Sequence, residues 1–559
     1  MPAAEPQPPD RAGSAPLAIV NGRVFTAAPD QRWAQAVGMS HGLITAVGST
    51  RKVLAALPRA EVVDVAGAAV LPGLIDAHNH FLATGESLAA ADVRYPRVRS
   101  VEDLAGAVAA AAAGQPAGSY VQAYGFDHAK YDRAPTRWDL DRAAPGHPVI
   151  VGHVSGHYVL ASSLAMAQAG VPEDAADPPG GELERDEAGR LTGMFRDAAM
   201  GLVQPTAVGI GHHGPNFHVS AGLADLVSAV ERAGTAYLAA GLTAVCDAQV
   251  TSRELGAYRE ARRLGRLPLR TVCMPLSHQL GEYEALGLAG PFGDDWLSLG
   301  AMKFYCDGSL IGGTAAFSSP YGAHGEFGGL LYWETAEFGA AVERAHSNGW
   351  QIGVHAQGDR AIGIVLDAFE SAQRAFRRDD PRFRIEHCGF PTDGQLARMR
   401  DLGVIAVCQP SYLHDSGDEF LGRLPQRAHR LQPLRSALNL GIPVVLSSDS
   451  DVASYRPLDT IAAAVTRRTA SGQPIGADQA LTVEEAVLAH TIAAAHAIRA
   501  EQRLGSLEPG KLADLVVLGG DLFGCDPDGI SDLGVAMTVI GGQVAVTGPP
   551  AAGNRTMAR

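Results

Sequence analysis

The chain has 559 residues, a formal net charge of -15 and a sequence pI of about 5.7. A net negative field attracts neither nucleic acid nor an anionic membrane surface, so the composition favours chemistry on a small molecule. Residues 1–15 are rich in Pro and Ala and lack an apolar core of signal-peptide length, and no segment is long enough to span a bilayer. We therefore expect a cytoplasmic protein whose first residues, 1–16, form a disordered leader.

A pair of histidines, His78-Asn79-His80, follows the apolar run Ala69–Ile75. Side chains alternate along a strand, so both imidazoles point to one side, which is a metal-binding geometry. Histidine and aspartate, which bind metals, recur at later apolar runs as His355, His387 and Asp449, and Lys303 lies within another run. With the histidine pair, these residues make one set of six.

Eight apolar runs of strand length alternate with helical stretches, and this pattern predicts an α/β fold, a (β/α)8 TIM-like barrel. The runs are residues 69–75, 242–247, 270–275, 301–308, 350–355, 383–387, 404–409 and 442–449. Active residues of such barrels lie at the carboxyl ends of the strands, where most of the candidate ligands fall. Lys303 is the exception, because it lies within its run, where an unpaired ammonium is costly to bury.

Several motifs together resemble the amidohydrolase superfamily and, within it, the YtcJ-like branch (amidohydrolase family 3), which includes N-substituted formamide deformylases. The resemblance covers nearly the whole chain and rests on residues 70–81, 181–184, 189–193, 307–309, 354–361, 384–387 and 503–516. It implies that both chain ends, residues 17–68 and 500–550, form a small β-sandwich beside a barrel of residues 69–499. Because such barrels average about 250 residues, the surplus after the first barrel strand, residues 85–234, is expected to form an inserted subdomain.

The resemblance also implies a binuclear metal centre. The implied assignment is His78, His80 and Asp449 on one ion, His355 and His387 on the other, and Lys303 between them as a carbamate. Imidazole and carboxylate ligands suit Zn, the expected metal, and also Mn, Fe and Co. An alternative is that Lys303 stays an ammonium that extends towards solvent or pairs with Asp307.

Three further residues are candidate substrate contacts. Residues 148–157 resemble the family segment that carries a histidine facing the substrate; His157 is the better match and His153 the weaker. Asp307 and Ser309 follow the fourth predicted strand. A satisfied core or surface histidine is the alternative reading of His157.

The expected reaction is hydrolysis of an amide C–N bond, in an N-formyl or N-acyl amine. Two divalent ions would lower the pKa of a bridging water, and Asp449 would take its proton and pass it to the leaving nitrogen. The alternatives are a lactone or ester hydrolase, a mononuclear deaminase, and a non-catalytic regulatory relative. Deaminases usually carry His-Ala-x-Glu where this chain has residues 355–358, His-Ala-Gln-Gly, and regulatory relatives tend to lose ligands that this chain retains.

The sequence departs from its relatives at two places. Residues 312–315 read Gly-Gly-Thr-Ala, without the arginine common there, and residues 448–451 read Ser-Asp-Ser-Asp instead of Ser-Asp-Trp-Pro. The loss of a cation and a large ring predicts a roomier, less cationic pocket that favours a bulky neutral substrate. The scattered cysteines are expected to be buried thiols, and a homodimer is the expected oligomer, because relatives are often dimers.

Overall fold

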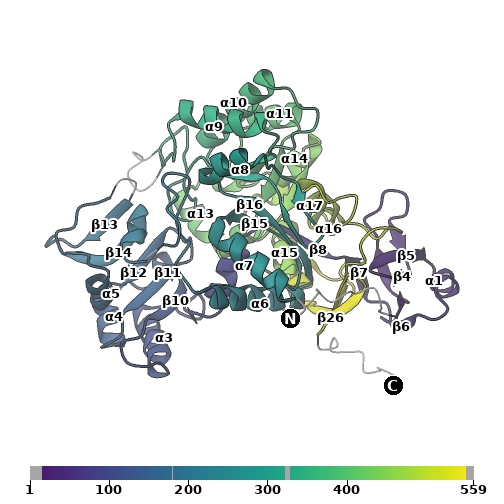
Figure 1. Ribbon diagram of the computed structural model, residues 1–559, viewed down its shortest axis with the longest axis horizontal. Helices are drawn as coiled ribbons and strands as arrows, with labels where there is room; N and C mark the ends of the chain where they lie inside the picture. Colours follow the sequence, from purple (N-terminus) through teal and green to yellow (C-terminus); the bar gives the residue numbers. More distant parts are fainter. Residues whose placement is uncertain (1–14, 179–180, 205, 322–327, 549–559) are drawn as a thin grey trace, which may run out of the picture.

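The structure is a computed structural model that describes residues 15–178, 181–204, 206–321 and 328–548. The expected leader lies outside these residues except for Ala15 and Pro16, as does the end of the predicted sandwich at residue 550. A central α/β part is flanked on one side by a separate sheet and on the other by sheets that both chain ends build (Figure 1). Of the helices in the described ranges, none combines the length and apolar character that crossing a bilayer requires.

Parallel strands form the centre in two sheets. One contains β8 (Leu74–Asn79), β15 (Leu242–Val250), β16 (Arg270–Pro275) and β18 (Leu297–Leu299), with the short antiparallel β17 (Phe292–Gly293) at its edge. The other contains β19 (Met302–Tyr305), β20 (Ile352–Ala356), β21 (Arg384–His387), β22 (Ile405–Cys408) and β23 (Val444–Leu446). The α/β class expected from the sequence is confirmed.

The two central sheets meet at both edges. Leu276, just after β16, forms a parallel bridge with Lys303 of β19. At the other edge the N–H of Asp449, after β23, donates to the carbonyl of His78 in β8, with an N···O distance of 2.9 Å. At this second edge the N–H of His80 also donates to the carbonyl of Ser450, with an N···O distance of 2.6 Å. Closure into one continuous barrel stays a prediction.

Helices pack around these strands. They are α2 (Phe81–Ser87), α6 (Leu223–Ala239), α7 (Ser252–Arg263), α8 (Leu280–Leu286), α9 (Thr335–Ser347), α10 (Asp359–Ala375), α11 (Asp393–Leu402), α12 (Ser411–Asp415), α13 (Gly417–Arg423), α14 (Leu434–Asn439), α15 (Pro457–Thr466), α16 (Val483–Ala489) and α17 (Ile492–Ala497). In α10 the buried residues Ile362, Val365, Leu366 and Phe369 recur every three to four positions, so one apolar face covers the sheet. Several helices begin at a residue whose side chain caps the first turn. In α7, Thr251 and Glu254 form a capping box.

Both chain ends contribute to the same sheet. It has the order β26-β25-β24-β7-β2-β3, and β7 pairs with β2 on one side and with β24 on the other. Its strands are β2 (Arg23–Phe25), β3 (Trp33–Ala34), β7 (Ala69–Pro72), β24 (Leu515–Leu518), β25 (Val535–Ile540) and β26 (Gln543–Thr547). A second sheet, ordered β5-β4-β1-β6, contains β1 (Leu17–Val20), β4 (Ala36–Ser40), β5 (Leu43–Gly48) and β6 (Glu61–Asp64), with α1 (Thr50–Ala56) against it. A shared apolar cluster that includes Ile19, Val37, Val70 and Leu515 lies between the sheets.

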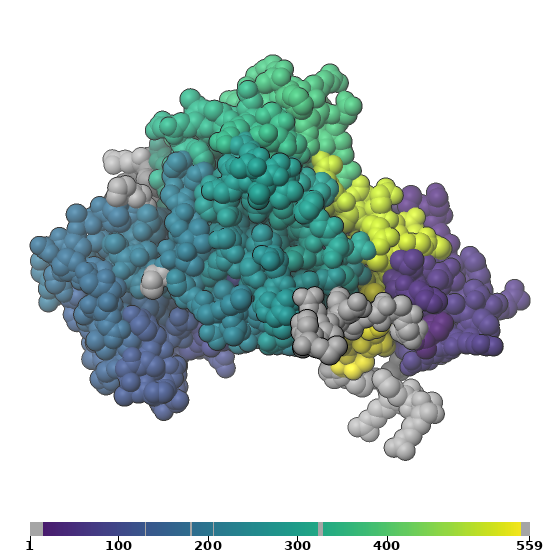
Figure 2. Space-filling view, in the orientation of Figure 1, coloured from purple at the N-terminus to yellow at the C-terminus, as the bar shows by residue number. Residues whose placement is uncertain are grey.

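A third region, the insert, lies on the opposite side of the central part, as Figures 1 and 2 show. Its sheet has the order β13-β14-β12-β11-β10-β9. The elements are β9 (Ala91–Asp92), α3 (Val101–Ala113), β10 (Val121–Phe126), α4 (Arg137–Ala143), β11 (Val149–His153), β12 (Tyr158–Ala161), α5 (Ser163–Gln168), β13 (Gly181–Arg185) and β14 (Leu191–Asp197). The predicted bounds, residues 85 and 234, fall inside α2 and α6. That the insert is a separate subdomain stays a prediction.

A buried ion pair links the central strands to the terminal sheet. Arg270 at the start of β16 contacts Asp514, which precedes β24, with Nε–Oδ2 at 2.6 Å and Nη2–Oδ1 at 2.9 Å. Both side chains are at most 4% exposed. Asp514 Oδ1 also accepts a hydrogen bond from the N–H of Gly541 at 2.8 Å. The carboxylate therefore contacts the central strands through Arg270 and the terminal sheet through Gly541.

We expect Arg270→Met to lower the free energy of unfolding by about 3–5 kcal/mol, because it leaves the Asp514 carboxylate buried without its cation. The matched control is Arg503→Met, since the Arg503–Asp295 pair, at 2.5 Å, has side chains that are 47% and 41% exposed. Exposed pairs contribute about 0–1 kcal/mol. Thermal melts of both variants test this, and equal falls in Tm would contradict it.

Candidate active site

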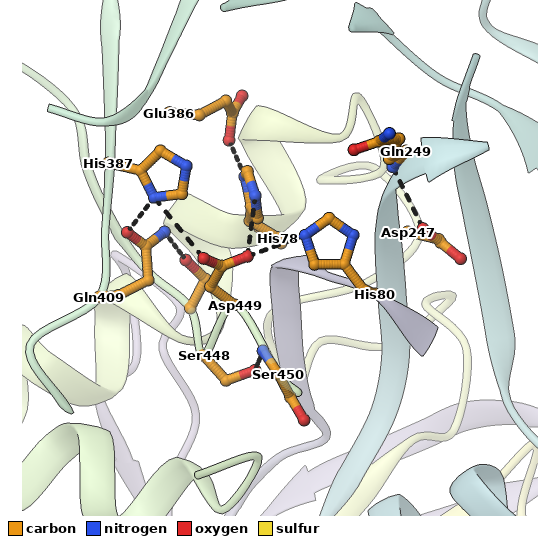
Figure 3. A network of polar contacts seen from close by, with 12 residues as sticks. His78, His80, Asp247, Gln249, Glu386, His387, Gln409, Ser448, Asp449 and Ser450 are labelled. Carbon is orange, nitrogen blue, oxygen red and sulfur yellow. Dashed lines mark hydrogen bonds and ion pairs between the residues drawn. The ribbon is translucent and has the colours of Figure 1, made fainter. Parts of the chain in front are cut away.

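Four candidate ligands, His78, His80, His387 and Asp449, lie together where the parallel strands end (Figure 3). His78 lies near the end of β8, His80 caps α2, Lys303 lies in β19, His355 in β20, His387 ends β21 and Asp449 follows β23. All six are buried. The ligand atoms of His78, His387 and Asp449 lie within 4.8 Å of one another.

Asp449 is the centre of this cluster. Its Oδ1 lies 3.4 Å from His78 Nε2 and 3.1 Å from His80 Nε2, and its Oδ2 lies 3.9 Å from His387 Nδ1. Burial raises the pKa of Asp449, but contacts with His78 and His80 outweigh burial and hold this pKa well below its usual range. The carboxylate is therefore ionised, as a metal ligand must be.

His78 is oriented from its other side. Its Nδ1 lies 2.5 Å from Glu386 Oε2, and Arg384 Nε donates to Glu386 Oε1 at 2.7 Å. Because Nδ1–H donates to the carboxylate, Nε2 carries the lone pair. That lone pair faces Asp449 Oδ1, and Nε2 has no hydrogen-bond partner among the described residues. Two electron-pair donors that face each other without a hydrogen fit a divalent cation between them.

Lys303 and His355 lie beside this cluster. Lys303 Nζ is fully buried, makes no hydrogen bond to the described residues and sits 4.6 Å from the centre of the Tyr305 ring. Burial lowers the pKa of Lys303 to about 8, so a larger fraction than usual is the neutral amine. His355 Nε2 lies 3.1 Å from the carbonyl oxygen of Gly308, and its ring centre is 4.4 Å from that of His387.

Burial favours the neutral form of His355 and His387, the form that metal binding requires, whereas contacts with Asp449 outweigh burial and raise the pKa of His80. Burial lowers the pKa of His387 to about 3 and holds that of His355 well below its usual range. His387 Nδ1 also lies 2.9 Å from Gln409 Oε1, which assigns the ring hydrogen to Nδ1 and leaves Nε2 to bind. The donor set of neutral imidazoles and a carboxylate thus fits a divalent metal ion.

The supporting residues Glu386, Gln409 and Tyr412 are absent from the sequence-based site. Tyr412, at the start of α12, donates its hydroxyl hydrogen to Asp449 Oδ2. One signal was available: Arg384 and Glu386 are two apart in a strand and so share a face, and a buried charge needs a partner. Gln409 and Tyr412 carry no comparable signal, because their role depends on where β22 ends.

The backbone is unusual at two of the ligands. His387 has φ of 70° and Asp449 has φ of 54°, both in the left-handed region that residues with a Cβ rarely adopt. Such conformations cost about 1–3 kcal/mol each and persist where the surroundings hold them, often at functional sites. The strand ends therefore hold both side chains at a conformational cost.

A cavity of about 430 Å³ lies above the cluster. His80, His355, His387 and Asp449 line its floor, and His153, His157 and Tyr124 of the insert line its opposite wall. Apolar side chains of the insert and the loop after it complete this wall: Ile150, Val159, Met200, Phe217 and Val219. The charged lining residues outside the cluster are Glu86, Asp225, Asp451 and Arg232, among the described residues.

Of the three predicted substrate contacts, two line the cavity and the third, Asp307, does not. His157 and Ser309 line the cavity. Asp307 is fully buried, and its carboxylate accepts the backbone N–H groups of Ala316, Gln357 and Gly358 at 2.8, 3.0 and 2.9 Å. Burial raises the pKa of Asp307 to about 7. These contacts indicate that Asp307 holds the turn after β20.

Asp127, His128 and His153 form a second group whose ligand atoms lie within 4.8 Å of one another. Two features oppose a metal ion there. The N–H of Ser155 donates to His153 Nδ1 at 3.1 Å, which places the ring hydrogen on Nε2, the atom towards Asp127. Lys130 Nζ, 3.3 Å from Asp127 Oδ2, already supplies a positive charge.

Buried imidazoles and a carboxylate at the ends of parallel strands, beneath a cavity, define a metal-dependent hydrolase. A sequence profile described as "Amidohydrolase family" matches residues 61–546, and the chain belongs to this family. The resemblance inferred from the sequence is thereby confirmed. The protein is a metal-dependent amidohydrolase of the class that acts on C–N bonds other than peptide bonds.

Individual relatives agree with this. The chain is 32% identical over 543 residues to the N-substituted formamide deformylase of Arthrobacter pascens, covering 94% of this chain and 97% of that protein. It is 26% identical over 532 residues to the putative amidohydrolase YtcJ of Bacillus subtilis, covering 94% and 98%. A solved structure of an uncharacterized metal-dependent hydrolase from Pyrococcus furiosus matches with a TM-score of 0.71 and 27% identity, over 92% of this chain and 100% of that chain.

We expect Glu386→Gln to weaken metal binding by about 10–100-fold, because it removes the charge that holds His78 Nδ1–H. Equilibrium dialysis against Zn²⁺ with elemental analysis measures this. Glu370→Gln is the control, since Glu370 is a part-exposed carboxylate that pairs with Arg398 on the outer face of α10. Unchanged metal affinity in Glu386→Gln would show that His78 does not need this partner.

Proposed function

We propose that the protein is a binuclear hydrolase that cleaves the amide C–N bond of an N-formyl or N-acyl amine. The observation that carries this proposal is the pair of facing donors, His78 Nε2 and Asp449 Oδ1, 3.4 Å apart and buried beneath the cavity. The similarity to an N-substituted formamide deformylase supports the choice of an amide substrate. The proposal also includes closure of the central strands into a (β/α)8 barrel, a cytoplasmic location and a homodimeric assembly.

The proposed ligand set is the one that the sequence resemblance implies, with Zn as the metal: His78, His80 and Asp449 on one ion, His355 and His387 on the other, and Lys303 between them. A neutral lysine amine reacts with carbon dioxide to form a carbamate, which carries a negative charge and two oxygen donors. The buried Lys303 amine, with a pKa of about 8 and no hydrogen bond to the described residues, supports this. When bound, the ions would polarise the substrate carbonyl and activate a water molecule near neutral pH.

The residues of the chain then complete the reaction. The Asp449 carboxylate accepts the proton that the attacking water loses as the new C–O bond forms. Tyr412, which donates to Asp449 Oδ2, holds this carboxylate in place. The insert covers the site and limits access of bulk water, while His157 and Ser309 contact the substrate.

The cavity supports a bulky, uncharged acyl or amine group. Its wall carries apolar side chains such as Ile150, Met200 and Phe217, and its charged lining has more carboxylates than cations among the described residues. A free carboxylate on the substrate would be repelled there. The sequence predicts a less cationic pocket on a separate ground, the absence of an arginine from residues 312–315.

A mass-spectrometric screen of Zn-loaded protein tests the reaction class. The pools are N-formyl amines, N-acyl aromatic amines, N-acyl amino acids, cyclic amides and lactones, with Lys303→Ala in parallel. We expect cleavage of a neutral amide by the native protein, and loss of both bound metal and activity in the variant. Cleavage of lactones alone would favour the esterase alternative. Unchanged metal content in Lys303→Ala would overturn the carbamate.

We expect Asp449→Asn to lower kcat by about 10²–10⁴-fold while losing proportionally less metal, because Asn keeps an oxygen donor but cannot accept the proton. Steady-state kinetics and metal analysis on the same preparation measure this. Asp393→Asn, an 84% exposed carboxylate on α11, is the control. Equal losses of rate and metal would restrict Asp449 to a ligand.

A further inference from the structure

His157 and Asp197 form a buried pair on the insert wall of the cavity. His157 Nδ1 lies 2.7 Å from Asp197 Oδ1, and the side chains are 6% and 15% exposed. His157 directly precedes β12 and Asp197 ends β14, two antiparallel strands in which Tyr158 pairs with Arg196. The register therefore brings the two residues opposite each other.

The backbone holds this pair at both residues. The N–H of Asp197 donates to the carbonyl of His157 at 2.8 Å, and the N–H of His157 donates to Ser155 Oγ at 3.2 Å. Asp197 has φ of 48°, in the left-handed region that is costly for a residue with a Cβ. A conformation of this cost at a cavity wall is typical of a functional position.

The contact decides which ring nitrogen remains for the substrate. Because the Asp197 carboxylate only accepts, the hydrogen in this contact is on His157 Nδ1. The other ring nitrogen, Nε2, has no hydrogen-bond partner among the described residues. When the ring is doubly protonated, its charge is offset by Asp197 and Nε2–H is available to donate into the cavity.

His157 also faces the reacting centre. It lines the same cavity as His355 and Asp449. The scissile bond of a substrate above the metal ligands would therefore lie between the strand ends and His157.

We propose that His157, positioned by Asp197, is the general acid that protonates the leaving nitrogen. This rests on the proposed amide hydrolysis. As the new C–O bond forms, Asp449 takes one proton from the attacking water. As the C–N bond breaks and the carbonyl re-forms, the proton on His157 Nε2 moves to the nitrogen, which leaves as a neutral amine. The proton on Asp449 then returns through water to the imidazole, and the sum is one water consumed for one acid and one amine.

Leaving groups of different basicity test this. An alkylamide nitrogen must be protonated before it leaves, whereas a nitrophenolate leaves without a proton. The substrates are the amide that the native protein cleaves in the screen and the nitrophenyl ester of the same acyl group. The variants are His157→Gln and Asp197→Asn. Glu182→Gln is the matched control, since Glu182 is a 58% exposed carboxylate on the same sheet.

We expect His157→Gln to lower kcat on the amide by about 10²–10⁴-fold and to leave ester cleavage nearly unchanged. Asp197→Asn should lower kcat on the amide by a smaller factor and should also leave ester cleavage nearly unchanged. Glu182→Gln should change neither rate. Equal losses on amide and ester, or a loss in KM alone, would overturn the general-acid role while leaving the proposed amide hydrolysis intact. A native protein that cleaves the ester but no amide would overturn both.

Discussion

The site depends on one electrostatic constraint: buried electron-pair donors face one another without a hydrogen between them. Because His78 gives its ring hydrogen to Glu386, its second nitrogen faces Asp449 Oδ1 at 3.4 Å. Asp449 also lines the cavity, so water can reach its carboxylate. A divalent cation between the two atoms would satisfy both electron-pair donors. The arrangement therefore fits a metal ion, in agreement with the family of metal-dependent hydrolases to which the chain is similar.

The strand register is what holds these donors together. His355 pairs with Tyr305, two residues after Lys303, and with Glu386, the residue before His387, so the ligands of neighbouring strands lie within two residues of one level. At the edge between the two sheets, the Asp449 N–H donates to the carbonyl of His78, which fixes the two ligands by their backbones. The orientation of the His78 ring is set separately, by its contact with Glu386 through Nδ1.

Much of the fold and the ligand set could be predicted from the sequence, because apolar runs that end in histidine or aspartate mark strand ends directly. The central strands were found in this way, with two exceptions. β18 and its partner β17 are too short to give a periodic signal, and the predicted run 69–75 covers β7 of the terminal sheet and only the start of β8. Contacts between distant segments could not be predicted. The partner of His157, Asp197, is forty positions away on another strand, and the pairing depends on the β12–β14 register. Asp307, a predicted substrate contact, shows the converse: it follows a strand end, but its carboxylate is used by backbone N–H groups.

Residues of both the central strands and the insert line the cavity, and this bears on which residue protonates the leaving nitrogen. The apolar side chains that would contact a bulky substrate lie largely on the insert. We therefore expect the leaving amine to lie next to the insert. Asp449 lies on the opposite side, surrounded by imidazoles and by the Tyr412 hydroxyl. Proton transfer needs hydrogen-bond distance, and a donor on the insert wall can reach a leaving nitrogen that faces the insert. An acid on the insert, separate from the base at the strand ends, is therefore the simpler geometry for this cavity.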